Sequence, residues 1–243
     1  MPDDKVIQKR YVAYFDMLGL KTATLRNPIE AWKALKSLQG CMDKILNLDV
    51  EVTSKKVFLR DRIQAFILAD SVLIFTGEDE LYDLSAILTL TSELFAQALS
   101  KCVPLRGAIT HGEFFYIIDK RLFGGIPFVK AYELERKAQW SGVVIDDDVV
   151  EHYKRWFNDM PKCQDGSSII ASWDIPLKGD KREQGLCLDW VKPHKADFRI
   201  QPPISVSDYY SGFKDLFGNF DDLPLDVQSK YINTVEFVNH SLI

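Results

Sequence analysis

The chain begins with an apolar run and an amphipathic segment. Residues 11–15 are apolar, aromatic and β-prone, which is typical of a strand buried on both faces. From residue 28 to residue 46 apolar positions recur every three or four residues, with Asn27 as the expected N-cap and Pro28 at the first helical position. The pattern therefore predicts a strand followed by an amphipathic helix.

The next segment reads as a hairpin, a helix and a strand. Residues 63–68 and 72–75 are β-type runs separated only by Ala69, Asp70 and Ser71, which predicts a tight antiparallel hairpin with Asp70 at its tip. A helical pattern follows at residues 80–101, and residues 103–115 read as another strand.

The order of these elements predicts the fold class. The β, α, β, β, α, β order is that of an α+β, ferredoxin-like domain, with an antiparallel-dominated sheet and helices on one face. A further helix is expected at residues 128–139 and a short strand at residues 142–146.

The signals weaken toward the C-terminus. Half of the ten prolines lie between residues 158 and 222, with candidate strands at 185–191 and 198–200 and a closing helix at 225–239. We expect a catalytic core at residues 1–157 and an elaboration at residues 158–243 that packs on it, as part of the same domain or as a subdomain.

Two aspartates interrupt the apolar pattern where strands end. Asp16 follows the first strand and Asp70 lies at the hairpin tip, and the topology rules place that strand beside the hairpin. Two adjacent carboxylates repel each other unless one is protonated or a cation lies between them. Each aspartate alone is also an ordinary turn or cap residue. Together, they favour a site for Mg²⁺ or Mn²⁺, and two such ions stabilise the attacking and leaving oxygens in phosphoryl transfer.

The segment after Asp16 is the expected phosphate cradle. Met17, Leu18 and Gly19 precede a helix and offer main-chain N–H groups to a triphosphate. We assign Met17 to the metal site as well, together with Asp16 and Asp70.

Two further side chains are candidates for substrate contacts. Arg106 suits bidentate recognition of phosphate and is assigned a catalytic contact, although an ion pair with Glu113 or Glu135 explains it equally well. Phe66 is suited to stacking on a base or packing in the core. His111 is expected to face solvent.

Composition excludes several classes of protein. With 243 residues, a net charge of −5 and a pI near 5.4, the chain lacks the clustered Lys and Arg side chains with which proteins bind nucleic-acid phosphates. Its four cysteines are isolated, so neither a zinc site nor a disulfide framework is predicted. A polar N-terminus and the absence of a long apolar run favour the cytoplasm and no membrane partner.

Five motifs carry a resemblance to a known family. "YFDMLGL", "LADSVLIF", "LRGAITHGE", "FGGIPFVKAYELERKA" and "GVVID" occur in the order and approximate spacing of the class III nucleotidyl cyclase catalytic domain, across residues 11–146. The resemblance implies that Asp16 and Asp70 bind two divalent ions. It also implies a head-to-tail homodimer with active sites at the interface.

The chain departs from that family at three positions. Phe66 stands where purine cyclases carry a base-reading lysine, and Val129 and Glu133 stand where they carry an asparagine and an arginine. Three interpretations remain open: an active enzyme for another base, a purine cyclase with a rearranged pocket, or a catalytically silent module that binds nucleotide or dimerises.

The compact form, the "LRGAITHGE" strand and the "AYELE" helix resemble the pyrimidine cyclases of bacterial antiphage signalling, the Pycsar family. This resemblance implies conversion of UTP, which we favour, or CTP to the cyclic monophosphate. The product would then activate a separate cyclic-nucleotide-responsive effector.

Overall fold

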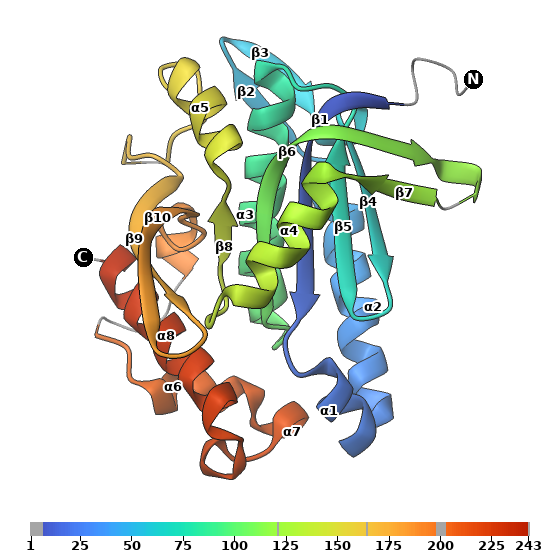
Figure 1. Cartoon of the computed structure of the whole chain (residues 1–243). Coiled ribbons are helices and arrows are strands. Elements are labelled where there is room, and N and C mark those ends of the chain that lie inside the picture. Colours follow the sequence, from blue (N-terminus) through green and yellow to red (C-terminus); the bar gives the residue numbers. More distant parts are fainter. Residues whose placement is uncertain (1–6, 121, 164, 198–202, 243) are drawn as a thin grey trace.

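The computed structural model describes residues 7–120, 122–163, 165–197 and 203–242, and its centre is one mixed sheet (Figure 1). The strand order is β4-β5-β1-β6-β8-β10-β9, with β7 paired to β6. All pairs are antiparallel except β6 with β8. The strands of this sheet are β1 (Ile7–Met17), β4 (Ile63–Leu68), β5 (Ser71–Thr76), β6 (Leu105–Ile117), β7 (Leu122–Gly125), β8 (Val143–Ile145), β9 (Ile170–Leu177) and β10 (Lys181–Leu188). The expected α+β fold with a mainly antiparallel sheet is confirmed.

Helices and a small separate hairpin complete the chain. The hairpin consists of β2 (Asp49–Val52) and β3 (Lys55–Phe58). The helices are α1 (Leu20–Arg26), α2 (Pro28–Ile45), α3 (Leu81–Ser100), α4 (Ile126–Lys137), α5 (Asp147–Arg155), α6 (Val206–Tyr210), α7 (Lys214–Phe217) and α8 (Leu225–Leu242). Short 3₁₀ turns lie at Leu59–Asp61, Ile118–Lys120, Lys192–Asp197, Ser211–Phe213 and Phe220–Asp222.

Local signals in the sequence explain the first elements. The Asn27 side chain accepts a hydrogen bond from the Glu30 N–H at 3.3 Å, and Pro28 begins α2, as predicted. The β4–β5 hairpin turns through Ala69 and Asp70, with Ala69 in the left-handed region at φ 59°. The predicted hairpin is confirmed, with Asp70 in its turn.

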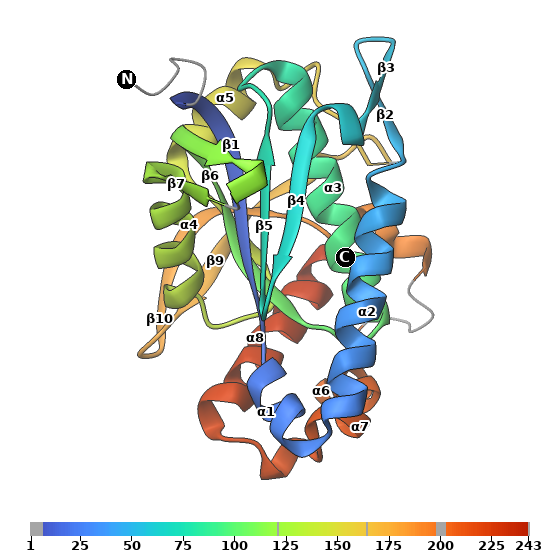
Figure 2. The same ribbon diagram turned by 90° about the vertical axis from the view of Figure 1, so that its right-hand side faces the viewer.

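The sheet carries helices on both faces, which corrects the prediction of one covered face. Consecutive residues of β1 point to opposite sides: the Tyr14 ring lies 5.4 Å from Phe128 of α4, and the Phe15 ring lies 5.4 Å from Phe95 of α3. Figure 2 shows α4 on one side of the sheet and α2 with α3 on the other. We call these sides the α4 face and the α3 face.

The C-terminal part extends the sheet and then closes over its end. β10 pairs with β8, so the sheet continues across the expected boundary at residue 157. The candidate strand at 185–191 overlaps β10, which begins four residues earlier and ends at Leu188, and the candidate at 198–200 lies outside the described residues. α8 then returns to the end of the sheet where β1 finishes and α1 begins (Figures 1 and 2).

Candidate active site

The end of β1 brings the two predicted aspartates together. In the sheet register Asp16 lies opposite Ser71 of β5 on one side and opposite Arg106 of β6 on the other. The Met17 N–H donates to the Asp70 carbonyl at 2.8 Å, which fixes the hairpin turn against the end of β1. Both aspartates therefore lie at the same end of the sheet, as the topology predicts.

The environment of Asp16 is unfavourable for a charge. Its side chain is 29% exposed, and burial raises the pKa of its carboxyl, with the nearby charge of Asp70 adding to the effect. Arg106 and Lys230 act in the opposite direction and lower that pKa. Asp70 itself is exposed. A cation placed between the two carboxylates would relieve their repulsion.

Arg106 holds the centre of this region. Its guanidinium is buried, with Nη2 3.7 Å from Oδ2 of Asp16, and it forms a close ion pair with Glu135 of α4. Nη1 also donates to the Ala138 carbonyl at 2.9 Å. Burial raises the pKa of Glu135, and the charge of Arg106 opposes that rise. Of the two ion-pair partners considered from the sequence, the structure pairs Arg106 with Glu135.

The turn after Asp16 has fewer free donors than the sequence suggests. The N–H groups of Met17 and Leu18 donate to the carbonyls of Asp70 and Pro104, at 2.8 and 2.9 Å. Gly19 adopts a left-handed φ of 78° just before α1. The Met17 side chain is only 3% exposed and packs in the core on the α3 face, so this residue has its main-chain carbonyl to offer a metal ion.

Phe66 lies on the same face as Asp16. It is opposite Leu73 of β5, which in turn is opposite Tyr14 of β1, two positions before Asp16. Its ring stacks on Phe75 at 6.0 Å and contacts Phe123 at 5.0 Å. The half-buried Phe66 therefore belongs to an aromatic cluster that borders the site.

The other departures from the family pattern lie on α4. Val129 is 55% exposed and Glu133 is also exposed. Tyr132, between them, contacts the Tyr14 ring at 5.8 Å. The outer surface of α4 thus presents an apolar residue and a carboxylate at the positions where the family carries asparagine and arginine.

The donor set fits a metal ion that substrate completes. Within the described residues no group of three or more His, Cys, Asp or Glu side chains could hold a metal. Mg²⁺ and Mn²⁺ commonly use one or two carboxylates, with substrate phosphates and water completing the shell. Asp16 and Asp70 are of this kind, because their carboxylates lie together and Asp16 is held in a site that disfavours its charge.

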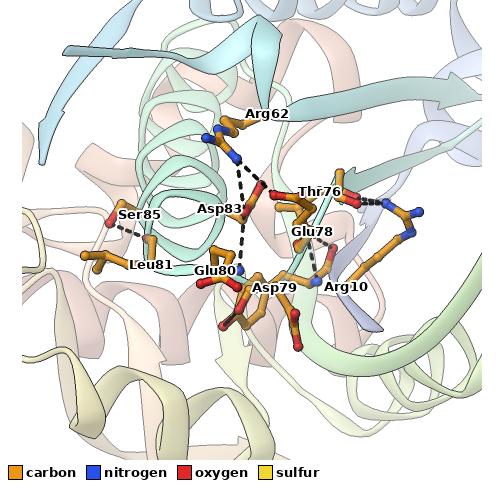
Figure 3. Close-up of polar contacts among 11 residues, drawn as sticks. Arg10, Arg62, Thr76, Glu78, Asp79, Glu80, Leu81, Asp83 and Ser85 are labelled. Atoms are coloured by element: carbon orange, nitrogen blue, oxygen red, sulfur yellow. Dashed lines mark hydrogen bonds and ion pairs between the residues drawn. The ribbon is translucent and has the colours of Figure 1, made fainter. Parts of the chain in front are cut away.

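A second charged cluster lies at the other end of β1 (Figure 3). Arg10 is buried, donates to the Thr76 carbonyl at 3.0 Å and also bonds the Gly77 carbonyl. Arg62 lies 3.5 Å from Asp83, a fully buried carboxylate, and burial raises the pKa of Asp83 to about 6. These groups join β1, β5 and the start of α3 through internal partners, so we interpret the cluster as structural.

His111 belongs to the same end of the molecule. The prediction that it faces solvent is wrong, because its side chain is 8% exposed and its Nε2 lies 3.0 Å from Oδ2 of Asp79. The His152 ring stands 4.4 Å away. The bend at Gly112 and the packing of α5 against β6 bury a side chain that the strand pattern alone leaves ambiguous.

Sequence reasoning did not identify two contributors to the candidate site. Ser71 shares a hydrogen bond of 2.7 Å with the Tyr14 hydroxyl beside Asp16, and Lys230 reaches the region from α8. Ser71 follows Asp70 directly, so the hairpin register could have found it. The sequence around Lys230 does not indicate that this residue lies near Asp16, because only the folding of the chain brings α8 to this end of the sheet.

Comparisons with known proteins address the fold. No family model matches the chain, and no curated protein matches it. The fold is that of nucleotidyl cyclase catalytic domains. The catalytic core of a rhodopsin-guanylyl cyclase with converted specificity, in complex with ATPαS, aligns with a TM-score of 0.51 and 14% identity, over 74% of this chain and 94% of that one. A bacterial light-regulated adenylyl cyclase aligns with a TM-score of 0.49 and 10% identity, over 87% of this chain and 56% of that one.

No helix in the described part of the chain combines the length and apolar character that crossing a membrane requires.

Proposed function

We propose that this protein is a metal-dependent nucleotidyl cyclase that converts a pyrimidine nucleoside triphosphate to its 3′,5′-cyclic monophosphate and pyrophosphate. The observation that carries the proposal is the meeting of Asp16 and Asp70 at the end of β1, within a fold shared with a cyclase catalytic core. Fold alone hosts many activities, so the two carboxylates carry the chemical argument.

The reaction is an intramolecular displacement. The ribose 3′ oxygen forms a bond to the α-phosphorus as the bond from that phosphorus to the bridging oxygen of pyrophosphate breaks, and the 3′-hydroxyl proton passes to solvent. Asp16 and Asp70 would orient the triphosphate indirectly, by holding the divalent ions that bind it at this end of the sheet. Arg106 acts as a positioning residue, because its charge favours the ionised form of Asp16 while Glu135 and the Ala138 carbonyl hold its guanidinium in place.

Two Mg²⁺ or Mn²⁺ ions, held by Asp16, Asp70 and the main-chain carbonyl of Met17, would supply Lewis-acid stabilisation of the attacking and leaving oxygens. Because the N–H groups of Met17 and Leu18 are already engaged, Gly19 and the residues after it would supply the main-chain N–H groups for the triphosphate.

Pyrimidine use is supported by the aromatic border of the site. Phe66 stands where purine cyclases carry the lysine that recognises the base. Its ring is held in place by contacts with Phe75 and Phe123. An aromatic surface binds a base by stacking without requiring a purine's hydrogen-bond pattern. UTP is the favoured substrate, with CTP next.

A homodimer is supported by the exposed apolar side chains beside the site. Leu68 of β4 is 38% exposed, and Ile126, Val129 and Tyr132 of α4 are between 41% and 60% exposed. Exposed apolar side chains close together are typical of a protein interface. A second copy seated here would cover the α4 face and complete two equivalent sites. In antiphage defence, the cyclic nucleotide would act as a second messenger for a separate effector.

Product analysis tests the proposal directly. The purified protein is incubated with Mn²⁺ and each of the four ribonucleoside triphosphates, and cyclic monophosphate and pyrophosphate are measured by mass spectrometry. Product from UTP or CTP alone is expected. Product from ATP or GTP would replace the pyrimidine assignment with a purine one, and metal-dependent triphosphate binding without pyrophosphate release would identify a catalytically silent module.

A further inference from the structure

A small cavity lies between the C-terminal helix and the turn that follows Asp16. It measures about 150 Å³. Its walls come from the Leu18–Gly19 turn and α1, from the segment around Phe217, and from one side of α8. We propose that this cavity binds a small organic acid, with an apolar body inside the cavity and a carboxylate against Lys230.

The wall defines the chemistry of the occupant. Most of the lining is aliphatic or aromatic, including Leu18, Phe217, Leu223 and Val227, and Lys230 is the ionised residue among the lining residues. A polyphosphate needs several charged donors around it, whereas the side chains of this wall offer one ammonium group beside apolar carbon. Small-molecule sites commonly combine apolar walls with a few placed polar groups. An apolar ligand with one anionic group matches both features.

The hydroxyls of Thr234 and Ser141 in the wall are already engaged. Thr234 donates to the Lys230 carbonyl at 2.6 Å and accepts from the Ser141 N–H at 2.8 Å, and the Ser141 hydroxyl donates to the Leu105 carbonyl at 2.7 Å. With these hydroxyls donating to main-chain carbonyls, the lysine ammonium is the charged donor that the cavity presents to a ligand.

Lys230 has a weak internal counter-ion. Its side chain is only 15% exposed, yet its ion-pair partner is Asp226 at 3.5 Å, which is itself 64% exposed, and Asp16 interacts with it only through longer-range electrostatics. Burial lowers the pKa of Lys230, and the positive charge of Arg106 adds to that effect. An additional carboxylate in the cavity would compensate a charge that the protein holds mostly out of water.

α8 is fixed at this position. The Asn233 side chain donates to the Gln139 carbonyl at 2.7 Å, next to the Thr234 contact with Ser141. Both hydrogen bonds tie α8 to the connection between α4 and β8. In the same connection, the Ala138 carbonyl accepts a hydrogen bond from Arg106. The cavity is therefore preorganised, and an occupant would touch both α8 and the turn after Asp16.

The volume limits the size of the ligand. A cavity of about 150 Å³ accommodates a benzene-sized group. A substituted benzoate can place its ring in the cavity and its carboxylate at Lys230, which makes 4-fluorobenzoate a suitable probe, and 4-fluorobenzamide is its neutral isostere.

The experiment measures binding by ¹⁹F NMR and does not use cyclase activity. We expect the native protein to bind 4-fluorobenzoate at least about tenfold more tightly than 4-fluorobenzamide, because only the former carries the charge. Lys230→Met should weaken the binding of 4-fluorobenzoate by a similar factor and leave the binding of 4-fluorobenzamide nearly unchanged. Lys33→Met is the matched control, since this exposed lysine of α2 pairs with Glu30 and neither residue lines the cavity, and it should have no effect.

Two further measurements keep the proposal falsifiable. Val227→Phe fills the cavity without removing Lys230 and should abolish binding of both probes, whatever the fate of the Lys230 variant. Equal binding by the native protein and both variants, or no binding by the native protein at millimolar probe, would overturn the proposal. Displacement of the probe by Mn²⁺ with pyrophosphate would also overturn it, because the cavity would then be part of the substrate site.

Discussion

At the start of β1, Arg10 donates to the Thr76 and Gly77 carbonyls, and the neighbouring Arg62 faces the buried Asp83 (Figure 3). At the end of the same strand, Arg106 lies between Glu135 and Asp16. Both ends combine buried guanidinium groups with carboxylates. At the first end the carboxylate is fully buried, whereas at the second end Asp16 stays partly exposed beside Asp70.

The difference indicates that the Arg10 end of β1 stabilises the fold and that the Arg106 end is available to bind a ligand. Asp83 takes part in helix capping, since it accepts the Glu80 N–H at 3.3 Å at the start of α3. Asp16 lacks a comparable local role, and its charge is disfavoured by burial and by Asp70. Burial disfavours the charge of both carboxylates, so the difference is that Asp16 stays partly exposed beside a second carboxylate and caps no helix, which is typical of a functional site.

The largest expected effect comes from the two aspartates of the candidate site. Asp16→Asn and Asp70→Asn should each reduce turnover by about 10³-fold or more, because metal-ion stabilisation contributes several kcal/mol to the transition state. Stability of the Asp16 variant should not fall, since the substitution removes a disfavoured charge. Cyclic-nucleotide formation and urea unfolding measure the two quantities.

Asp83→Asn is the matched control at the other end of β1. It should retain most of the native turnover. A loss of turnover equal to that of Asp16→Asn, from a folded protein, would contradict the division of roles between the two ends.

The next largest effect concerns the Arg106–Glu135 pair. Arg106→Met should lower the free energy of unfolding by about 3–5 kcal/mol, because it leaves Glu135 buried without its counter-ion. Replacing both residues by methionine should recover most of that loss, since a buried pair can often be exchanged for apolar side chains. Urea denaturation decides the matter: a double variant as unstable as the single one would show that the buried Glu135 charge is not the cause.

A smaller effect is expected in the turn after Asp16. Gly19→Ala should cost about 1–2 kcal/mol, because Gly19 has a left-handed φ of 78° and an added Cβ would lie 2.9 Å from the Phe217 ring. Gly40→Ala in α2 is the control, since that position has open space and should gain about 0.4–1 kcal/mol. Thermal unfolding of the two variants in parallel should therefore give shifts of opposite sign.

The smallest effect is a pH dependence at the Arg10 end. The folded pKa of Asp83 is about 6, above the ordinary unfolded value of about 3.9. The folded state therefore binds the proton more tightly, so this group's contribution to stability is greatest at low pH and is lost as pH rises through about 6. Relative to Asp83→Asn, the native protein should gain about 1 kcal/mol between pH 7 and pH 5. An unchanged difference across this range would show that Asp83 does not titrate there.

The sequence was sufficient for the central elements because their signals are local. The apolar runs of β1, β4 and β5 and the helical periodicity of α2 and α3 identify these elements directly. The β2–β3 hairpin was not predicted, because Thr53 and Ser54 adopt positive φ without the glycine or asparagine that marks such turns. β9 contains Pro176, which argues against a central strand and is tolerated here because β9 lies at the sheet edge.

The site was predictable to the same extent. The proximity of Asp16 and Asp70 was predicted because each interrupts an apolar run close to where a strand ends, and topology brings the two together. The partner of Arg106 was left open, although Glu113 is an odd number of residues away on the same strand and so points to the opposite face. The role of α4 on that face, and the approach of Lys230 from α8, depend on long-range packing that no local pattern encodes.

Nucleotide-dependent binding of Mn²⁺ tests the central claim most directly. Free Mn²⁺ is measured by electron paramagnetic resonance with and without the non-hydrolysable analogue α,β-methylene-UTP, for the native protein and for the protein carrying both Asp16→Asn and Asp70→Asn. The account predicts that the analogue strongly increases Mn²⁺ binding by the native protein and that the double variant loses this increase. Equal nucleotide-dependent binding by the two proteins would show that the end of β1 is not the metal site.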